Sequence, residues 1–151
     1  MTSFGFRVYG TPSPQGSKIP GVNRKTGKMF VREQSGERLK TWREAVKEAA
    51  LMARGDSDTI PKGIAVRIHI DFYMPRPASI PFEKRPMPSV APDLDKMIRG
   101  VGDALRDAGI YADDSQVCSI VAHKHYASEK IELSAGAWIV VQAIPNDPRL
   151  S

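Results

Sequence analysis

Apolar and polar residues alternate along several short stretches of the chain, which is the pattern of strands buried on one face. The clearest stretch is 64–74, IAVRIHIDFYM, whose alternating apolar positions are Ile64, Val66, Ile68, Ile70 and Phe72. Residues 4–10, FGFRVYG, alternate in the same way, and residues 28–33, KMFVRE, follow a turn signal. The C-terminal part adds two predicted strands, 116–127 and 130–145, which we expect to be adjacent and antiparallel.

Two other segments repeat apolar residues at steps of three and four, as amphipathic helices do. The first is 37–54, with Gly55 as a suitable stop. The second is 93–108, which has Pro92 and Asp93 as start signals and Gly109 as a C-terminal cap. This order of elements predicts an α+β fold, a mixed sheet of about four to five strands with two main helices. The second helix lies between two strands and suggests a crossover connection.

Two loops separate these elements. Residues 11–23, TPSPQGSKIPGVN, are rich in proline, glycine and serine, and residues 75–92 form a longer proline-rich stretch. Ordered loops of that length in compact domains are often functional. The 151 residues of the chain, with no internal repeat or long linker, predict a single domain over 1–151.

Composition narrows the class of protein. An apolar content of 41% and a charged content of 26% are those of a globular protein, and no apolar run is long enough to cross a membrane. The N-terminus lacks the pattern of a signal peptide. Cys118 is the one cysteine, so the chain can form no internal disulfide. We therefore expect a cytoplasmic protein with no membrane partner.

Charge is unevenly distributed along the chain, whose net charge is +5. Basic residues dominate residues 1–90 and are densest at 18–40, whereas acidic residues dominate 91–151. An acidic focus beside a basic stretch suggests a polyanion that approaches a cation-binding centre. A solvated surface with some asymmetry explains the same pattern equally well.

The acidic focus consists of two aspartate pairs on either side of the second helix, Asp93 with Asp95 and Asp113 with Asp114. Aspartate at a helix start is commonly a cap, so the first pair alone needs no further account. If the two pairs met, their oxygens would suit Mg²⁺ and phosphodiester hydrolysis. The helix is roughly 24 Å long, however. The pairs can therefore meet only through a tilted helix, or if Asp114 comes from another element or chain.

Residues 92–117, PDLDKMIRGVGDALRDAGIYADDSQV, resemble the signature of the RusA family of Holliday junction resolvases, in which a D-L-D leads into an amphipathic helix followed by D-D-[AS]-Q-V. The segment GTPSPQGSK at 10–18 is similar to a second, weaker motif of the family. The resemblance implies a homodimeric, Mg²⁺-dependent endonuclease that cuts four-way DNA junctions by paired symmetric incisions in recombination and repair. It implies that Mn²⁺ substitutes for Mg²⁺ and that no small-molecule cofactor is used.

Carried over by position, the resemblance implies that Asp93, Asp95 and Asp114 bind the metal, with Asp113 as an auxiliary ligand. An important helical lysine of the family falls on Arg99, which keeps the charge but is unsuited to proton transfer. Arg99 and Lys96 are then expected to stabilise charge on the phosphoryl group. A non-catalytic module that binds branched or single-stranded DNA and a metal-dependent nucleotide phosphohydrolase remain as alternatives.

Basic loop residues are the predicted contacts to DNA phosphates, with solvated loop charge as the alternative. The predicted DNA-binding residues are Lys18, Arg24, Lys25, Lys28, Arg76, Lys84, Arg85 and Gln116. His123 and His125 share one face of their strand, and a solvated or phosphate-contacting pair is preferred there over a zinc site. His69 is expected to be structural.

Overall fold

The computed structural model describes residues 2–15, 18–33 and 36–146, and within this part it is an α+β domain with two α-helices, two short 3₁₀ helices, η1 (Asp114–Gln116) and η2 (Glu129–Ile131), and two sheets. The main sheet has four strands in the order β1-β6-β4-β5. These strands are β1 (Ser3–Tyr9), β4 (Val66–Met74), β5 (Val117–Tyr126) and β6 (Gly136–Ala143). A separate ribbon pairs β2 (Lys18–Val22) with β3 (Met29–Glu33). The predicted fold class is confirmed.

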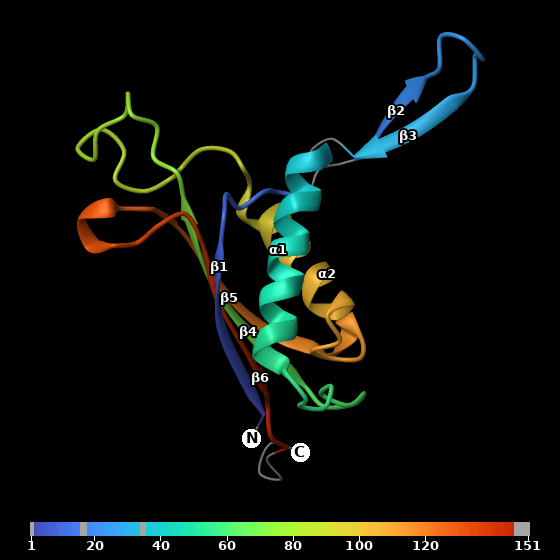
Figure 1. Cartoon of the computed structure of the whole chain (residues 1–151), viewed down its shortest axis with the longest axis vertical. Coiled ribbons are helices and arrows are strands. Elements are labelled where there is room, and N and C mark those ends of the chain that lie inside the picture. Colours follow the sequence, from blue (N-terminus) through green and yellow to red (C-terminus); the bar gives the residue numbers. More distant parts are fainter. Residues whose placement is uncertain (1, 16–17, 34–35, 147–151) are drawn as a thin grey trace.

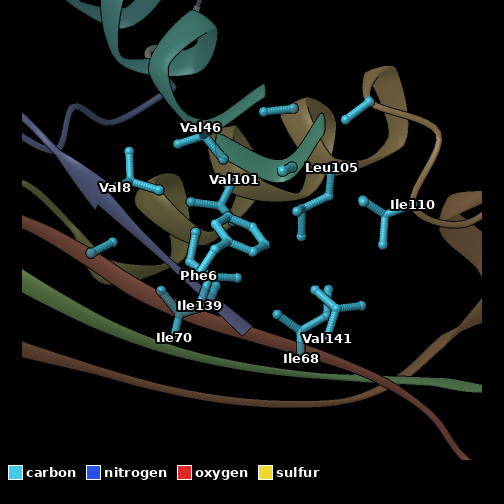
Figure 2. Packing of buried hydrophobic residues seen from close by; sticks show 14 of the residues in the cluster. Phe6, Val8, Val46, Ile68, Ile70, Val101, Leu105, Ile110, Ile139 and Val141 are labelled. Carbon is cyan, nitrogen blue, oxygen red and sulfur yellow. The ribbon is translucent and has the colours of Figure 1, made fainter. Parts of the chain in front are cut away.

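Both long helices, α1 (Gly36–Arg54) and α2 (Leu94–Asp107), cover the same face of the main sheet (Figure 1). The helices bury the apolar stripes that their periodicity predicts, including Trp42 and Val46 of α1 and Val101 and Leu105 of α2. These side chains pack on the inward positions of the strands, among them Phe6, Ile68, Ile70, Ile139 and Val141 (Figure 2). Within the described ranges, the opposite face of the sheet carries no helix.

The pairing of the strands follows the sequence only in part. β4 and β5 are parallel and α2 connects them, so the predicted crossover is confirmed. β5 and β6 are not adjacent, and the prediction that they pair antiparallel is wrong, because β6 inserts between β1 and β4 and pairs antiparallel with both. The prediction that 11–23 is a loop is also wrong in part, since Lys18–Val22 pairs with β3.

Helix α2 ends in a glycine cap that fixes where the chain leaves it. Gly109 adopts a left-handed conformation with φ 68°. The Ile110 N–H donates to the Leu105 carbonyl and the Gly109 N–H to that of Arg106, which is the Schellman arrangement. The chain then turns through Asp113 and the short helix η1 (Asp114–Gln116) directly into β5.

Three strands run in the same direction and end at one edge of the sheet. β4 and β5 are parallel, and β1 shares their direction because both β1 and β4 are antiparallel to β6. The β2–β3 ribbon, the start of α1 and the proline-rich loop 75–92 all lie at this end of the molecule, opposite the two termini (Figure 1). Ligands of open α/β sheets bind at such carboxyl edges. In the described part of the chain no helix has the length and apolarity needed to cross a membrane.

Candidate functional site

Asp93 and Asp95 lie at the carboxyl edge, where α2 begins. Asp93 is the N-cap of α2 with extended backbone, yet its side chain makes no capping hydrogen bond. Both aspartates are exposed, and the nearest cation is the Lys96 ammonium, 3.7 Å from an Asp93 oxygen. The carboxylates are therefore free to bind a ligand instead of the helix. Two exposed carboxylates one residue apart are a donor set that fits Mg²⁺, which takes one or two protein carboxylates and otherwise water and phosphate oxygens.

Two contacts hold the start of α2 in place. Lys124 projects from the helix-covered face of β5, and its ammonium donates to the carbonyls of Val90 and Pro92 at 2.9 Å each. The backbone N–H of Gln15 donates to the Lys96 carbonyl at 3.0 Å, which ties the segment after β1 to the first turn of α2. Sequence patterns alone did not predict a role for Lys124. The one signal for it is a charged residue on the strand face that otherwise carries Ile120 and Ala122.

Arg99 follows Asp95 by one helical turn and is exposed. Among the described residues it has no carboxylate within 4.0 Å, so it forms no i, i+4 ion pair with Asp95 or Asp103. Arg99 and Asp103 instead line a pocket of about 210 Å³ between α2 and β5, together with Tyr111, Asp114 and Ile120. The guanidinium is thus available for a phosphate group.

Asp114 lies at the other end of α2. Its carboxylate accepts from Arg106 at 2.9 Å, one residue before the helix ends. Burial and the nearby charges of Asp114 and Asp103 raise the pKa of Tyr111, whose hydroxyl donates to the Gly102 carbonyl. Asp113 caps η1 by accepting from the Ser115 N–H at 2.9 Å, and hydrogen bonds from Ser115 lower the pKa of Asp113.

The two aspartate pairs do not meet within one chain. From Asp95 to Arg106 the helix rises about 16 Å. The strand gives a second measure, because Lys124 contacts the loop before Asp93 and β5 extends about 23 Å from Val117 to Lys124. Among the described residues, the one group of three or more His, Cys, Asp or Glu with ligand atoms within 4.8 Å lies elsewhere. Asp93 and Asp95 therefore share one place, and Asp114 and Asp113 another.

Gln116 is not available to DNA, and its prediction as a DNA-binding residue is wrong. Its side chain is 5% exposed. The amide nitrogen donates to the carbonyls of Pro61 and Ile64 at 2.8 and 3.0 Å, and the oxygen accepts from the N–H groups of Ala112 and Asp113 at 2.8 Å each. The residue joins the turn before β5 to the turn before β4, so its role is structural.

The predicted DNA contacts fall into two groups. Arg24, Lys25 and Lys28 are exposed on the turn between β2 and β3, a ribbon that projects beyond the helices (Figure 1). Asn23 shapes this turn, since its side-chain oxygen accepts from the N–H groups of Lys25 and Thr26. The side chain of Lys18 lies outside the described residues.

In the proline-rich loop, Lys84 is exposed, whereas the two arginines are engaged within the protein. Arg76 donates to the carbonyls of Ile80, Arg85 and Pro86 and stacks on Tyr126, 4.1 Å from the ring centre. Arg85 donates to the Tyr126 hydroxyl at 3.1 Å. Arg76 therefore organises the loop, and its role as a phosphate contact stays a prediction.

A second polar cluster lies on the sheet face away from the helices. The carboxylate of Asp71, on β4, is hydrogen-bonded to Nε2 of His69 at 3.1 Å and to Nε2 of His125 at 2.9 Å. The Nδ1 atom of His123 lies 3.4 Å from the same carboxylate. Burial alone would raise the pKa of Asp71, but hydrogen bonds from His125 and His69 hold it below its ordinary value. His69 is thus not an isolated structural residue but a neighbour of the other two histidines.

Comparison with known proteins bears on the site. The sequence profile of Endodeoxyribonuclease RusA matches residues 12–134, which include both aspartate pairs, both long helices and two of the four strands of the main sheet. The chain belongs to the RusA family. This RusA-family protein is also 32% identical over 138 residues to the uncharacterized protein YqaN of Bacillus subtilis (strain 168), with 85% of the chain and 92% of YqaN covered. The expected membership in a family of endodeoxyribonucleases is confirmed.

Proposed function

We propose that this RusA-family protein is a Mg²⁺-dependent endonuclease that cleaves four-way DNA junctions by paired, symmetric incisions. The observation that carries the proposal is the Asp93–Asp95 pair, exposed and free of capping bonds at the start of α2. The pair lies at the end of the domain that also carries the basic ribbon and the proline-rich loop. A polyanionic backbone held by those loops would reach the carboxylates.

In this proposal Asp93 and Asp95 hold the divalent cation, Mg²⁺ or Mn²⁺. Bound there, the cation would supply an acidified water as nucleophile and charge compensation for the leaving oxygen. The free guanidinium of Arg99, one turn along α2, binds a non-bridging oxygen of the scissile phosphate. Lys96, already beside Asp93, adds a second positive charge on the same side.

Asp114 enters this site from a second subunit. Within one chain it pairs with Arg106, a residue about 16 Å along the helix axis from Asp95. A two-fold dimer in which one chain's α2 start meets the other's α2 end would bring the partner subunit's Asp114 to Asp93 and Asp95. Such an interface is self-complementary and creates two equal sites, as a pair of symmetric incisions requires.

The exposed basic turn of the ribbon supplies affinity without sequence preference. Arg24, Lys25 and Lys28 have the charge and exposure for phosphate contacts, and such contacts position a duplex without reading its bases. A projecting ribbon on each subunit of a dimer would hold separate arms of a branched substrate.

The proposal is tested with purified protein and a four-way junction labelled on each strand in turn, in Mg²⁺, Mn²⁺ or EDTA. We expect symmetric nicks in two opposing strands with either metal and none in EDTA, and a dimer by sizing. Binding without nicking at every metal concentration would instead indicate a non-catalytic DNA-binding module. Nucleotide hydrolysis without DNA cleavage would indicate a phosphohydrolase, and full activity of a strict monomer would contradict paired incision.

A further inference from the structure

All three histidines of the chain lie around one carboxylate. His69 and Asp71 belong to β4, and His123 and His125 to β5, so the group bridges two parallel strands. Asp71 stands directly opposite His123 in the register of these strands. All four residues point to the sheet face away from the helices, because their positions alternate with the buried Ile68, Ile70 and Phe72. The register of the two strands thus brings three imidazole rings to one carboxylate on this face.

We propose that His69, Asp71 and His123 form a binding site for one divalent transition-metal ion of the Zn²⁺ class, separate from the carboxylates of α2. One ligand atom of each residue lies within 4.8 Å of the others. Ligands about 2.0–2.1 Å from a tetrahedral Zn²⁺ are roughly 3.3 Å apart. Nε2 of His69 lies 3.1 Å from Oδ2 of Asp71 and Nδ1 of His123 lies 3.4 Å from Oδ1, so each of these histidine nitrogens is already near that spacing from a carboxylate oxygen.

The donor set defines the class of metal. Imidazole nitrogens favour Zn²⁺, Ni²⁺, Cu²⁺ or Co²⁺, whereas Mg²⁺ prefers oxygen ligands. Two nitrogens and one carboxylate oxygen thus disfavour Mg²⁺ at this site. Three protein ligands leave one position for water.

The surroundings of the three ligands are ordered for this role. Nε2 of His125 lies 2.9 Å from the Asp71 oxygen and holds the carboxylate toward the other two histidines. The ring of His125 in turn stacks on Tyr73, with centroids 5.4 Å apart. His125 is therefore a positioning residue, which orients the Asp71 carboxylate by a hydrogen bond without binding the metal itself.

A metal ion at this position links β5 to the rest of the sheet. β5 is an edge strand that pairs with β4 alone among the described strands. One ion bound to side chains of both strands would resist their separation. Because the ion binds the folded strands and not the unfolded chain, it raises the thermal midpoint.

The test uses protein without a histidine tag, freed of metal by a chelator and kept in Mg²⁺ throughout. Titration with Zn²⁺ should give one equivalent per chain, and Co²⁺ should give the intense visible absorption of a four-coordinate ion. Three imidazoles are few enough to follow singly by NMR. The chemical shifts of the His69 and His123 imidazoles should reach their final values at one equivalent of Zn²⁺. The chemical shift of the His125 imidazole should change by a smaller amount.

Variants separate ligands from neighbours. His69→Gln and His123→Gln should each lower the Zn²⁺ affinity by more than about a hundredfold, and His125→Gln by roughly 10–100-fold. Asp95→Asn and Cys118→Ser should bind Zn²⁺ as the unaltered protein does. Each variant is checked for fold by circular dichroism.

Three outcomes would overturn the proposal. The first is the absence of stoichiometric Zn²⁺ binding by the unaltered protein. The second is a His69 or His123 resonance that does not shift at one equivalent of Zn²⁺, a measurement made on the unaltered protein. The third is unchanged affinity in folded His123→Gln. None of these outcomes depends on nuclease activity. Failure of the Zn²⁺ site therefore leaves the proposed endonuclease function intact, and failure of the endonuclease assay leaves the Zn²⁺ site intact.

Discussion

Asp95 is the residue whose replacement best separates chemistry from binding. Asp95→Asn keeps the shape of the side chain and removes one negative charge from the exposed start of α2. We expect junction cleavage to fall at least about a thousandfold, roughly 4 kcal/mol of transition-state stabilisation. Junction binding should be unchanged or tighter, because less negative charge faces the phosphates. Gel-shift and single-turnover cleavage assays on one preparation measure both.

Asp107→Asn is the matched control for that experiment. Asp107 is exposed on the same helix but at its far end, where it pairs with Arg43 at 3.4 Å. A surface pair of this kind contributes about 0–1 kcal/mol to stability. Cleavage by Asp107→Asn should match the unaltered protein; an equal loss in both variants would mean that charge on α2, and not the Asp95 ligand, matters.

Arg99 tests what the helical cation contributes. The guanidinium has no carboxylate partner within 4.0 Å in the described part of the chain, so no ion pair there competes with phosphate for it. Arg99→Lys should cut within roughly tenfold of the unaltered rate, a change of about 1.4 kcal/mol. Arg99→Ala should be impaired far more. A thousandfold loss in Arg99→Lys would instead show that both guanidinium nitrogens bind the phosphate at once.

Gln116 is the residue for which the sequence-based prediction was most clearly wrong. Its replacement should change the stability of the fold and not the binding of DNA. Removal of the amide in Gln116→Ala leaves buried N–H and carbonyl groups of two turns without partners. Each unsatisfied group costs about 1–3 kcal/mol, so we expect the free energy of unfolding in urea to fall by about 3 kcal/mol or more. Ser115→Ala, exposed next to it, is the control. A change under about 0.5 kcal/mol would contradict this role.

At the scale of elements, hydrophobic periodicity predicted the helices and strands that bury one regular apolar face. α1, α2, β1 and β4 lie within two residues of the predicted bounds, because each buries a regular apolar stripe. β2 was missed, since KIPGV carries glycine and proline and belongs to a ribbon outside the core. The position of β6 between β1 and β4 depends on long-range pairing, which no local pattern in the sequence encodes.

The ribbon itself makes a prediction about DNA affinity. Replacement of Arg24, Lys25 and Lys28 by alanine should weaken binding to junctions and duplexes of any sequence alike. The slope of log affinity against log salt should become shallower by about 0.9 for each phosphate that the variant no longer neutralises. The same number of charges removed at Lys40, Lys47 and Lys62, exposed elsewhere, is the control. Equal slopes in the two triple variants would exclude the ribbon as a DNA-binding element.

At the scale of the whole molecule, the sequence identifies the candidate ligands but cannot place them in space. The resemblance to the RusA motif implies Asp93, Asp95 and Asp114 as ligands, and the crossover carries Asp114 to the opposite edge of the sheet from the other two. Because α2 and β5 each have a fixed rise per residue, the connection between them leaves Asp114 away from the start of α2, where Asp93 and Asp95 lie. The convergence of three histidines on Asp71 was invisible for a related reason, because the register of β4 on β5 creates it.

Mixed dimers test whether the nuclease site is shared between subunits. If Asp95 of one chain acts with Asp114 of the other, a dimer of Asp95→Asn with Asp114→Asn keeps one intact site. Two differently tagged chains allow its purification, and it should nick one strand of a labelled junction although each variant alone is inactive. Asp93→Asn mixed with Asp95→Asn is the control, since those residues act from the same chain and leave both sites defective. An inactive first mixture from a confirmed heterodimer would mean that each site is built within one chain, so that α2 or η1 must move when DNA binds.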